Sequence, residues 1–306
     1  MKEKKKILVV GGSGFIGYHL LKKCLKLGWK CTSISSKKPK QIRKLKKVKY
    51  IICDISKHKR LKKKLKEHFN YVINLGGHVD HSNKTAVYQS HYIGCKNLAN
   101  IFIKKNIDTF VQISSCMEYG NLKSPQIEKK TIKLKKLKSN YGQSKLLASI
   151  HLKKMYRLYK FPVVILRLYQ VYGPKQDLNR FLPIVISSCL KNKKFPCTEG
   201  SQLRDFIYIE DVVEAIIKSL DNSNIYGDDF NIGSGKPFKI KEITKIINKY
   251  IGKGKPLYGK IKMRKDEIKK LFPDIKKASL NLQWKPKIKF LSGISKTINY
   301  YKNEKL

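Results

Sequence analysis

The strongest constraint on the fold is a glycine-rich turn near the start of the chain. Residues 7–10 (Ile-Leu-Val-Val) predict a buried strand, and the periodic apolar residues of 15–25 predict a helix. Between them, three glycines follow one another at intervals of three residues. Such a turn directs free backbone N–H groups and the positive end of the helix at one point, which suits a pyrophosphate. We therefore predict a dinucleotide site that includes Gly11, Gly14, Phe15, Ile16 and Gly17.

Strand and helix patterns alternate through the first half of the chain. This alternation is typical of an α/β fold with a doubly wound parallel sheet, the Rossmann arrangement. The second half is less regular and has more loops with Gly and Pro. We therefore expect a dinucleotide-binding domain over residues 1–167 and a smaller substrate-binding lobe over residues 168–306, partly interwoven with the first. The expected strands are 7–10, 30–35, 49–54, 71–75, 109–115 and 162–168, and the clearest helices are 15–25, 88–105 and 141–159.

The net charge of +47 comes from lysines that are spread through the helical patterns rather than gathered in one block. The basic residues are not interleaved with aromatic residues in the way that base stacking requires. A solvated lysine surface therefore explains the charge better than a nucleic-acid site. The positive field would still help to capture an anionic substrate.

The composition also bears on location. No apolar run reaches the ~18 residues of a membrane-spanning helix, and the lysine-rich N-terminus leads directly into a strand rather than a signal peptide. The seven cysteines include no C-x-x-C pair, so free thiols in a reducing cytoplasm are expected. We expect a cytoplasmic protein that binds neither a membrane nor a nucleic acid. We expect no metal site either, because His78, Asp80 and His81 are too few ligands.

Tyr141 and Lys145 lie four residues apart in a helical pattern, so their side chains share one face. A nearby ammonium favours phenolate, which predicts that the pKa of Tyr141 is lowered from its reference value of about 10. Such a tyrosine can exchange a proton in an alcohol–ketone interconversion. Ser115 ends the preceding strand, where its hydroxyl could hold the carbonyl oxygen. The Tyr–Lys spacing alone is weak evidence, because two side chains on a solvated helix surface would show the same spacing.

Together these segments resemble the extended short-chain dehydrogenases/reductases, in the branch that modifies nucleotide sugars. The likeness extends over about residues 7–215. It implies an NAD(P)-dependent oxidoreductase with a Rossmann fold that acts on a nucleotide-diphosphate sugar. The matching motifs are Gly11-x-x-Gly14-x-x-Gly17, Asp54, Asn74-Leu75-Gly76-Gly77, Ser114-Ser115-Cys116-Met117-Glu118-Tyr119-Gly120, Tyr141-x-x-x-Lys145, the octapeptide RLYQVYGP at 167–174, and Arg204-Asp205-Phe206-Ile207-Tyr208.

The resemblance implies a role for each matching residue. Ser115, Tyr141 and Lys145 would form the catalytic triad, and Asp54 would contact the adenine. Arg204 would bind the diphosphate of the substrate, although a surface ion pair with its neighbour Asp205 would give the same sequence pattern. A homodimer formed through the helices that flank the sheet is also implied. The predicted cofactor contacts are Gly11, Gly14, Phe15, Ile16, Gly17, Ser35, Ser36, Lys37, Asp54, Ile55, Leu75, Gly76, Gly77, Tyr141 and Lys145, and the predicted substrate contacts are His81, Ser115, Gln170, Arg180 and Arg204.

One departure from the family pattern concerns the cofactor. The NAD-dependent members carry an acidic residue at the end of the second strand, where this chain has Ser35 followed by Ser36 and Lys37. A carboxylate binds the ribose 2′-hydroxyl and repels a 2′-phosphate, whereas hydroxyls and lysines favour the phosphate. We therefore expect NADP(H) in preference to NAD(H).

Other departures concern the reaction. Cys116 and Met117 stand where the 4,6-dehydratases of the family carry an Asp–Glu pair, so water elimination would lack its acid and base. His91 and Gln170 each stand where the family has Asn. The missing Asp–Glu pair argues against a dehydratase, whereas the changes at His91 and Gln170 concern the proton relay and the sugar pocket.

The variant Glu118-Tyr119-Gly120 resembles the group that reduces the C4 ketone of nucleotide-linked 6-deoxy-4-keto-hexoses in deoxysugar and surface polysaccharide biosynthesis. An NADPH-dependent 4-ketoreductase is therefore the expected function, with Tyr141 as the proton donor to O4. A nucleotide-sugar 4-epimerase, which uses the same triad, is the alternative. A further alternative is a non-catalytic dinucleotide- or RNA-binding relative.

Overall fold

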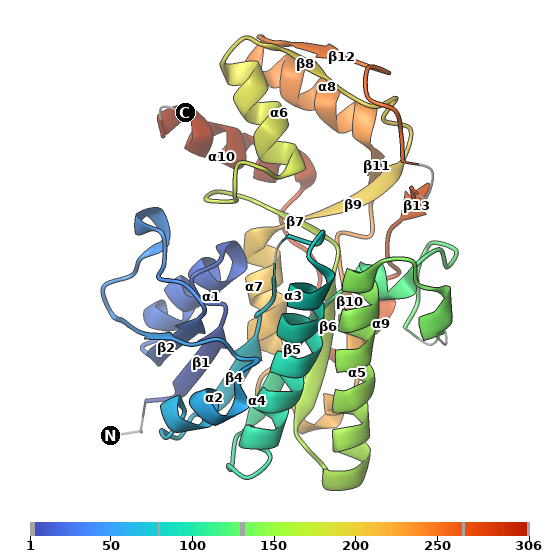
Figure 1. Cartoon of the computed structure of the whole chain (residues 1–306). Coiled ribbons are helices and arrows are strands. Elements are labelled where there is room, and N and C mark those ends of the chain that lie inside the picture. The colour runs from blue at the N-terminus through green and yellow to red at the C-terminus, as the bar shows by residue number, and fades with distance from the viewer. Residues whose placement is uncertain (1–3, 79, 129–131, 265–266, 305–306) are drawn as a thin grey trace.

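The computed structural model describes residues 4–78, 80–128, 132–264 and 267–304. Its central element is a sheet of seven strands, all parallel, in the order β10–β6–β5–β4–β1–β2–β3 (Figure 1). The predicted α/β fold with a doubly wound parallel sheet is thus confirmed. The strands are β1 (Lys6–Val10), β2 (Lys30–Ser35), β3 (Val48–Ile52), β4 (Tyr71–Asn74), β5 (Thr109–Ser115), β6 (Val163–Leu168) and β10 (Asp229–Ile232).

Helices cover both faces of this sheet because successive strand residues point to opposite sides. In β1, Ile7 and Val9 pack into a core with helices α1 and α7, whereas Leu8 and Val10 pack into a second core with α2, α4 and α5. Both sets of side chains are buried, which explains why the strands read as continuous apolar runs. The helices are α1 (Phe15–Lys26), α2 (His58–Lys64), α4 (Gly94–Phe102), α5 (Asn140–Tyr159) and α7 (Ile209–Lys218).

The helical stretch before β5 starts earlier than the predicted residue 88 and is not a regular helix. It begins as α3 (Lys84–Tyr88), where the Asn83 side chain accepts a hydrogen bond of 3.0 Å from the Ala86 amide. A π-helical turn (Gln89–Ile93) then leads into α4. Such turns add one residue to a helix and are frequent at functional sites.

A smaller lobe lies above the carboxyl ends of the strands (Figure 1). Its four-stranded sheet has β9 paired with β7, β11 and β13, and β8 pairs with β12 beside it. The division at residue 167 stays a functional prediction, because β10 and α7 return from this half of the chain to the first sheet and to α1. The other elements of this half of the chain are β7 (Gln170–Tyr172), α6 (Phe181–Leu190), β8 (Lys194–Pro196), β9 (Leu203–Tyr208), β11 (Pro237–Lys239), α8 (Ile240–Ile251), β12 (Lys255–Leu257), β13 (Lys270–Leu271), α9 (Lys276–Asn281), which packs beside β10, and α10 (Phe290–Asn303).

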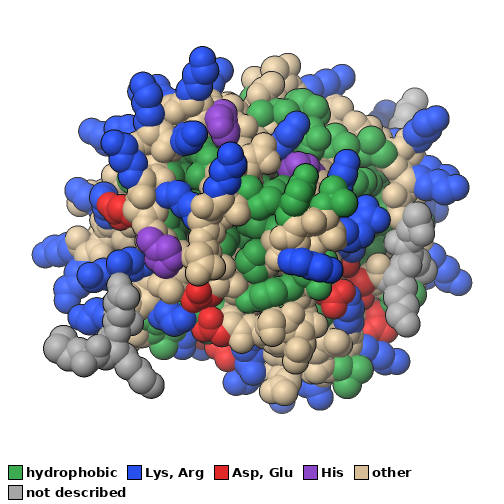
Figure 2. Space-filling view, turned by 90° about the horizontal axis from the view of Figure 1, so that it is seen from below, with side chains coloured by type: hydrophobic (Ala, Val, Ile, Leu, Met, Phe, Trp, Pro, Cys, Tyr) green, Lys and Arg blue, Asp and Glu red, His purple; other side chains and the backbone are tan. Residues whose placement is uncertain are grey.

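The lysine surface is visible on the face seen from below, where Lys and Arg side chains surround a hydrophobic region (Figure 2). Within the described ranges, no helix combines the length and the apolar composition needed to cross a membrane. All seven cysteines are free thiols, and six of them are buried.

Candidate active site

A cleft of about 1670 Å³ runs along the carboxyl ends of β1, β2, β4 and β5 and under the smaller lobe. Parallel sheets bind ligands at this edge, where neighbouring connections leave in opposite directions. All residues predicted to contact cofactor or substrate, from Gly11 to Arg204, line this one cleft. Their individual roles stay predictions.

The glycine turn leaves the start of α1 open to a ligand. Gly14 is the N-cap residue and no side chain caps the helix, so its first N–H groups are free of a capping side chain. Gly11 has a φ of +77°, and a Cβ at Gly17 would lie 2.5 Å from the Gly11 carbonyl oxygen. Both positions therefore need glycine for the strand and helix to meet so closely. The turn fits the pyrophosphate of a dinucleotide.

The end of β2 presents hydroxyls and cations to the cleft. The Ser35 Oγ lies 3.5 Å from the Ser13 amide nitrogen, beside the loop that starts at Ser36. Asp54 lines the cleft near this end, where its carboxylate accepts a hydrogen bond of 2.9 Å from the Ser56 amide. The cleft-lining cations on this side are Lys37, Lys38, Lys40 and Arg43.

The predicted triad lies together at the centre of the cleft. Ser115 Oγ accepts a bond of 3.2 Å from the Met117 amide, and Ser115 and Tyr141 line the same part of the cleft. Lys145 Nζ donates to the carbonyl oxygen of Ile113 at 2.8 Å and lies 5.9 Å from the centre of the Tyr141 ring. The strand end and the first two turns of α5 thus bring two hydroxyls and one ammonium to the same place.

The expected lowering of the Tyr141 pKa is wrong for this structure. Burial raises the pKa of Tyr141 to about 12, and the hydrogen bond from Ser115 opposes this effect only in part. Burial also lowers the pKa of Lys145 to about 8, against the opposing effects of Cys95 and Glu118. Removal from water disfavours the charged form of both groups, and it is the largest cause of each shift. At pH 7 the Tyr141 hydroxyl therefore keeps its proton.

Two histidines enclose the Tyr141 ring. The His81 ring is stacked on it with 4.1 Å between centroids, and the His91 ring meets it edge-on at 5.0 Å. Burial lowers the pKa of His91 to about 2, so its imidazole is neutral. Gly77 makes room for this ring, because a Cβ there would lie 1.8 Å from His91 Cε1. The π-helical turn places His91 here, a contact that sequence spacing did not reveal.

The other end of the cleft is also cationic. Arg204 is nearly buried and forms an ion pair with Glu267, not with its neighbour Asp205. The Asp205 carboxylate instead accepts hydrogen bonds from the amide and hydroxyl of Ser234, at 2.6 and 3.0 Å. The expected alternative of a surface pair between Arg204 and Asp205 is thus wrong. The sequence did not reveal further lining residues here, Arg264, Glu267 and Ile268, because they lie in a segment without a recognisable motif.

The sequence model of the NAD dependent epimerase/dehydratase family matches residues 7–233. The chain belongs to this family. The resemblance seen in the motifs is therefore confirmed, and the chain is an NAD(P)-dependent enzyme of the oxidoreductase type.

The chain is similar in sequence to several nucleotide-sugar enzymes. A putative UDP-glucose 4-epimerase of Methanocaldococcus jannaschii is 31% identical over 309 residues, which cover 97% of this chain and 98% of that protein. CDP-abequose synthase of Salmonella muenchen is 40% identical over 105 residues, which cover 34% of this chain and 36% of that protein. The crystal structure of Thermotoga maritima UDP-glucose 4-epimerase with UDP-glucose superposes with a TM-score of 0.91 at 24% identity, and the match covers 98% of this chain and 100% of that chain. The last likeness supports the fold.

Proposed function

We propose that this enzyme uses NADPH to reduce the C4 ketone of a nucleotide-linked 6-deoxy-4-keto-hexose. The observation that carries the proposal is the Tyr141 hydroxyl, which burial keeps protonated beside Ser115. A protonated phenol is ready to act as the acid that a reduction needs, whereas an alcohol oxidation needs a base first. Bound NADPH would supply the hydride to C4. Ser115 would orient O4, and Tyr141 would deliver the proton to it.

The residues after Ser115 support reduction over dehydration. Elimination of water needs a second acid and base near the sugar, and Cys116 and Met117 offer neither. The next carboxylate in the chain, Glu118, is fully buried and is bonded to Ser149 and Arg167 instead of facing the cleft.

The charges at the cleft support anionic ligands at both ends. Ser35, Ser36 and Lys37 favour a ribose 2′-phosphate, which we infer to be that of NADPH. Arg180, Arg204 and other cations at the far end suit a diphosphate, because guanidinium groups bind phosphate oxygens in pairs. We therefore infer a nucleotide-diphosphate sugar as the substrate.

Deuterium transfer tests the proposal. The purified protein is mixed with a panel of nucleotide-linked 6-deoxy-4-keto-hexoses and NADPH that carries deuterium at the transferable position. We expect stoichiometric loss of NADPH and a 4-hydroxy product labelled at C4. No loss of NADPH with any 4-keto substrate, together with C4 epimerisation of a 4-hydroxy nucleotide sugar, would refute the reductase.

The second candidate is a nucleotide-sugar 4-epimerase. The similarity to a putative UDP-glucose 4-epimerase over 97% of the chain favours it. An epimerase would return its hydride in each cycle, so UDP-glucose and UDP-galactose should interconvert with no added reductant. This second assay, run beside the deuterium-transfer assay, separates the two candidates.

A further inference from the structure

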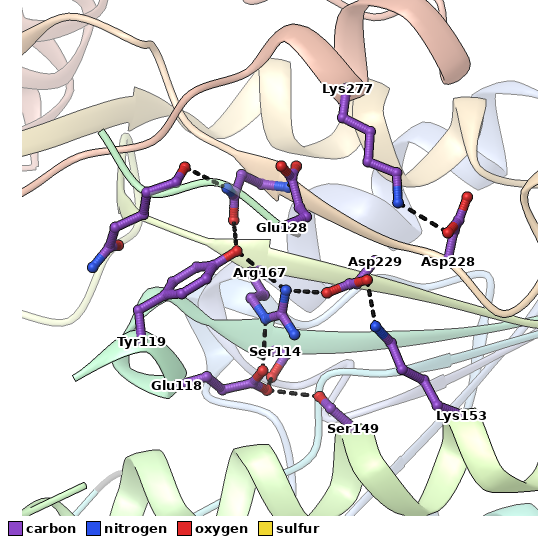
Figure 3. Close-up of polar contacts among 12 residues, drawn as sticks. Ser114, Glu118, Tyr119, Glu128, Ser149, Lys153, Arg167, Asp228, Asp229 and Lys277 are labelled. Atoms are coloured by element: carbon purple, nitrogen blue, oxygen red, sulfur yellow. Dashed lines mark hydrogen bonds and ion pairs between the residues drawn. The ribbon is translucent and has the colours of Figure 1, made fainter. Parts of the chain in front are cut away.

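A buried carboxylate lies directly behind the catalytic serine. Glu118 belongs to the 3₁₀ turn Cys116–Tyr119 that follows β5, and its side chain has no exposed surface. Glu118 accepts hydrogen bonds from Ser114 in β5, from Ser149 Oγ in α5 at 2.7 Å and from Arg167 Nε in β6 at 2.6 Å (Figure 3). One carboxylate therefore joins two strands and a helix.

The partner Arg167 is just as deeply buried and is itself held from several sides. Its guanidinium forms a second ion pair with Asp229 of β10 and donates to the Tyr119 hydroxyl at 3.2 Å (Figure 3). Asp229 in turn pairs with Lys153 Nζ of α5 at 2.5 Å. Buried charges persist only when they are paired and hydrogen-bonded, so these contacts constrain one another's positions.

The geometry of α5 connects this cluster to the reacting groups. Tyr141, Lys145 and Ser149 follow one another at intervals of four residues and share one face of the helix. Ser115 is adjacent to Ser114 at the end of β5. Glu118 therefore ties the strand end that carries Ser115 to the helix that carries Tyr141, one turn beyond Lys145.

We propose that Glu118, together with Arg167, is a positioning residue that fixes the Ser115 hydroxyl relative to Tyr141 and Lys145. This inference rests on the proposed roles of those three residues. Catalysis by aligned groups is sensitive to small displacements, and a misplacement of about 1 Å can cost on the order of 10²-fold in rate. Neither Glu118 nor Arg167 lines the cleft, so their loss should affect turnover more than binding.

The main test compares two serines of the same helix. Ser149→Ala removes one hydrogen bond to Glu118, and Ser144→Ala is the matched control. Ser144 is equally buried, but its hydroxyl bonds to the carbonyl oxygen of Asn140 within the helix at 2.8 Å. We expect Ser149→Ala to lower kcat by roughly tenfold with little change in KM, and Ser144→Ala to leave both unchanged.

Two further measurements make the test specific. Glu118→Gln should lower kcat by roughly 10²-fold, and Ser149→Ala added to it should cause no further loss, because the serine acts through Glu118. If Glu118→Gln fails to fold, the comparison of Ser149→Ala with Ser144→Ala still tests the positioning role. Hydrogen exchange in peptides 113–120 and 141–149 should accelerate in Ser149→Ala but not in Ser144→Ala.

The turnover number is measured in whichever reaction the wild type catalyses, ketone reduction or C4 epimerisation. A failure of the reductase proposal therefore leaves this test intact. Equal kcat values for the two serine variants, equal exchange, or a loss confined to KM would overturn the positioning role.

Discussion

Replacing Lys145 by Met should make the protein more stable at pH 7 while it removes turnover. Lys145 is buried, and its pKa is lowered from 10.5 to about 8. At about 1.4 kcal/mol per pKa unit, keeping this charge out of water costs the folded state about 3 kcal/mol while the lysine is protonated. The variant also loses the bond from Nζ to the Ile113 carbonyl oxygen, worth about 1 kcal/mol. That oxygen keeps a bond of 2.8 Å from Gln112 Nε2, so it is not left without a donor.

The net gain in the free energy of unfolding is therefore about 2 kcal/mol at pH 7. For 306 residues, an unfolding entropy of about 2 cal/mol/K per residue turns this into a rise in Tm of about 3 °C. Met suits the site because it is unbranched and adapts to irregular space. The proposed role of Lys145 needs its ammonium group, so turnover should fall to background in the variant.

The pH dependence of the stability difference shows whether it comes from removing the buried charge or from better packing of the Met side chain. The folded pKa of Lys145 is depressed, so between about pH 8 and 10.5 the unfolded wild type holds a proton that the folded state has lost. The stability of the wild type therefore gains from rising pH in that window, and above it the variant loses its advantage and is left less stable by the lost bond of about 1 kcal/mol. Urea unfolding of both proteins at pH 7 and pH 10.5 measures the difference.

A control change on the same helix, exposed Lys154→Met, should show no such trend. A Lys145→Met protein that is less stable than wild type at pH 7 refutes the reasoning. So does a gain that is undiminished at pH 10.5, because it would not come from the buried charge.

Three other substitutions test the cleft. Tyr141→Phe should leave NADPH affinity unchanged and lower turnover by ~10²-fold or more, the scale of general acid catalysis, and steady-state rates near wild type would remove this residue from the mechanism. Ser35→Asp should weaken the binding of NADPH relative to that of NADH, because a carboxylate repels the 2′-phosphate. Titration with both cofactors should show that the preference for NADPH is reduced or inverted, and an unchanged ratio of the two dissociation constants would contradict the predicted preference for NADP(H). Gly17→Ala should abolish binding of either dinucleotide, since its Cβ would lie 2.5 Å from the Gly11 carbonyl oxygen, and unaltered binding in calorimetry would contradict the close approach.

The sequence predicts the parts of the site that depend on local geometry. The glycine turn is a feature of a short segment, and its backbone conformation follows from residue type. Tyr141 and Lys145 meet because of helical periodicity, and Ser115 reaches them because parallel strands end at one edge. These rules need no knowledge of distant contacts.

The parts that the sequence leaves open depend on contacts between distant segments. Glu118 meets Arg167 across 49 residues of sequence, and nothing in the motif Glu-Tyr-Gly indicates that the carboxylate turns inward. The pKa of Tyr141 depends on how completely other segments exclude water, which periodicity does not report. The ion pair of Arg204 with Glu267, rather than with its neighbour Asp205, likewise depends on a contact between distant segments.

The return of β10 to the edge of the first sheet has a consequence for synthesis. A chain emerging from the ribosome makes β6 well before residues 229–232, and domains generally fold as their parts emerge. During that interval β6 is a bare edge, with a row of backbone N–H and C=O groups that can template pairing with another chain. The sheet of the first half is therefore completed only by a strand encoded after β7, α6, β8 and β9 of the upper lobe. A gene split after residue 167 would yield a fragment prone to aggregate, whereas a fragment extended through β10 could close its own sheet.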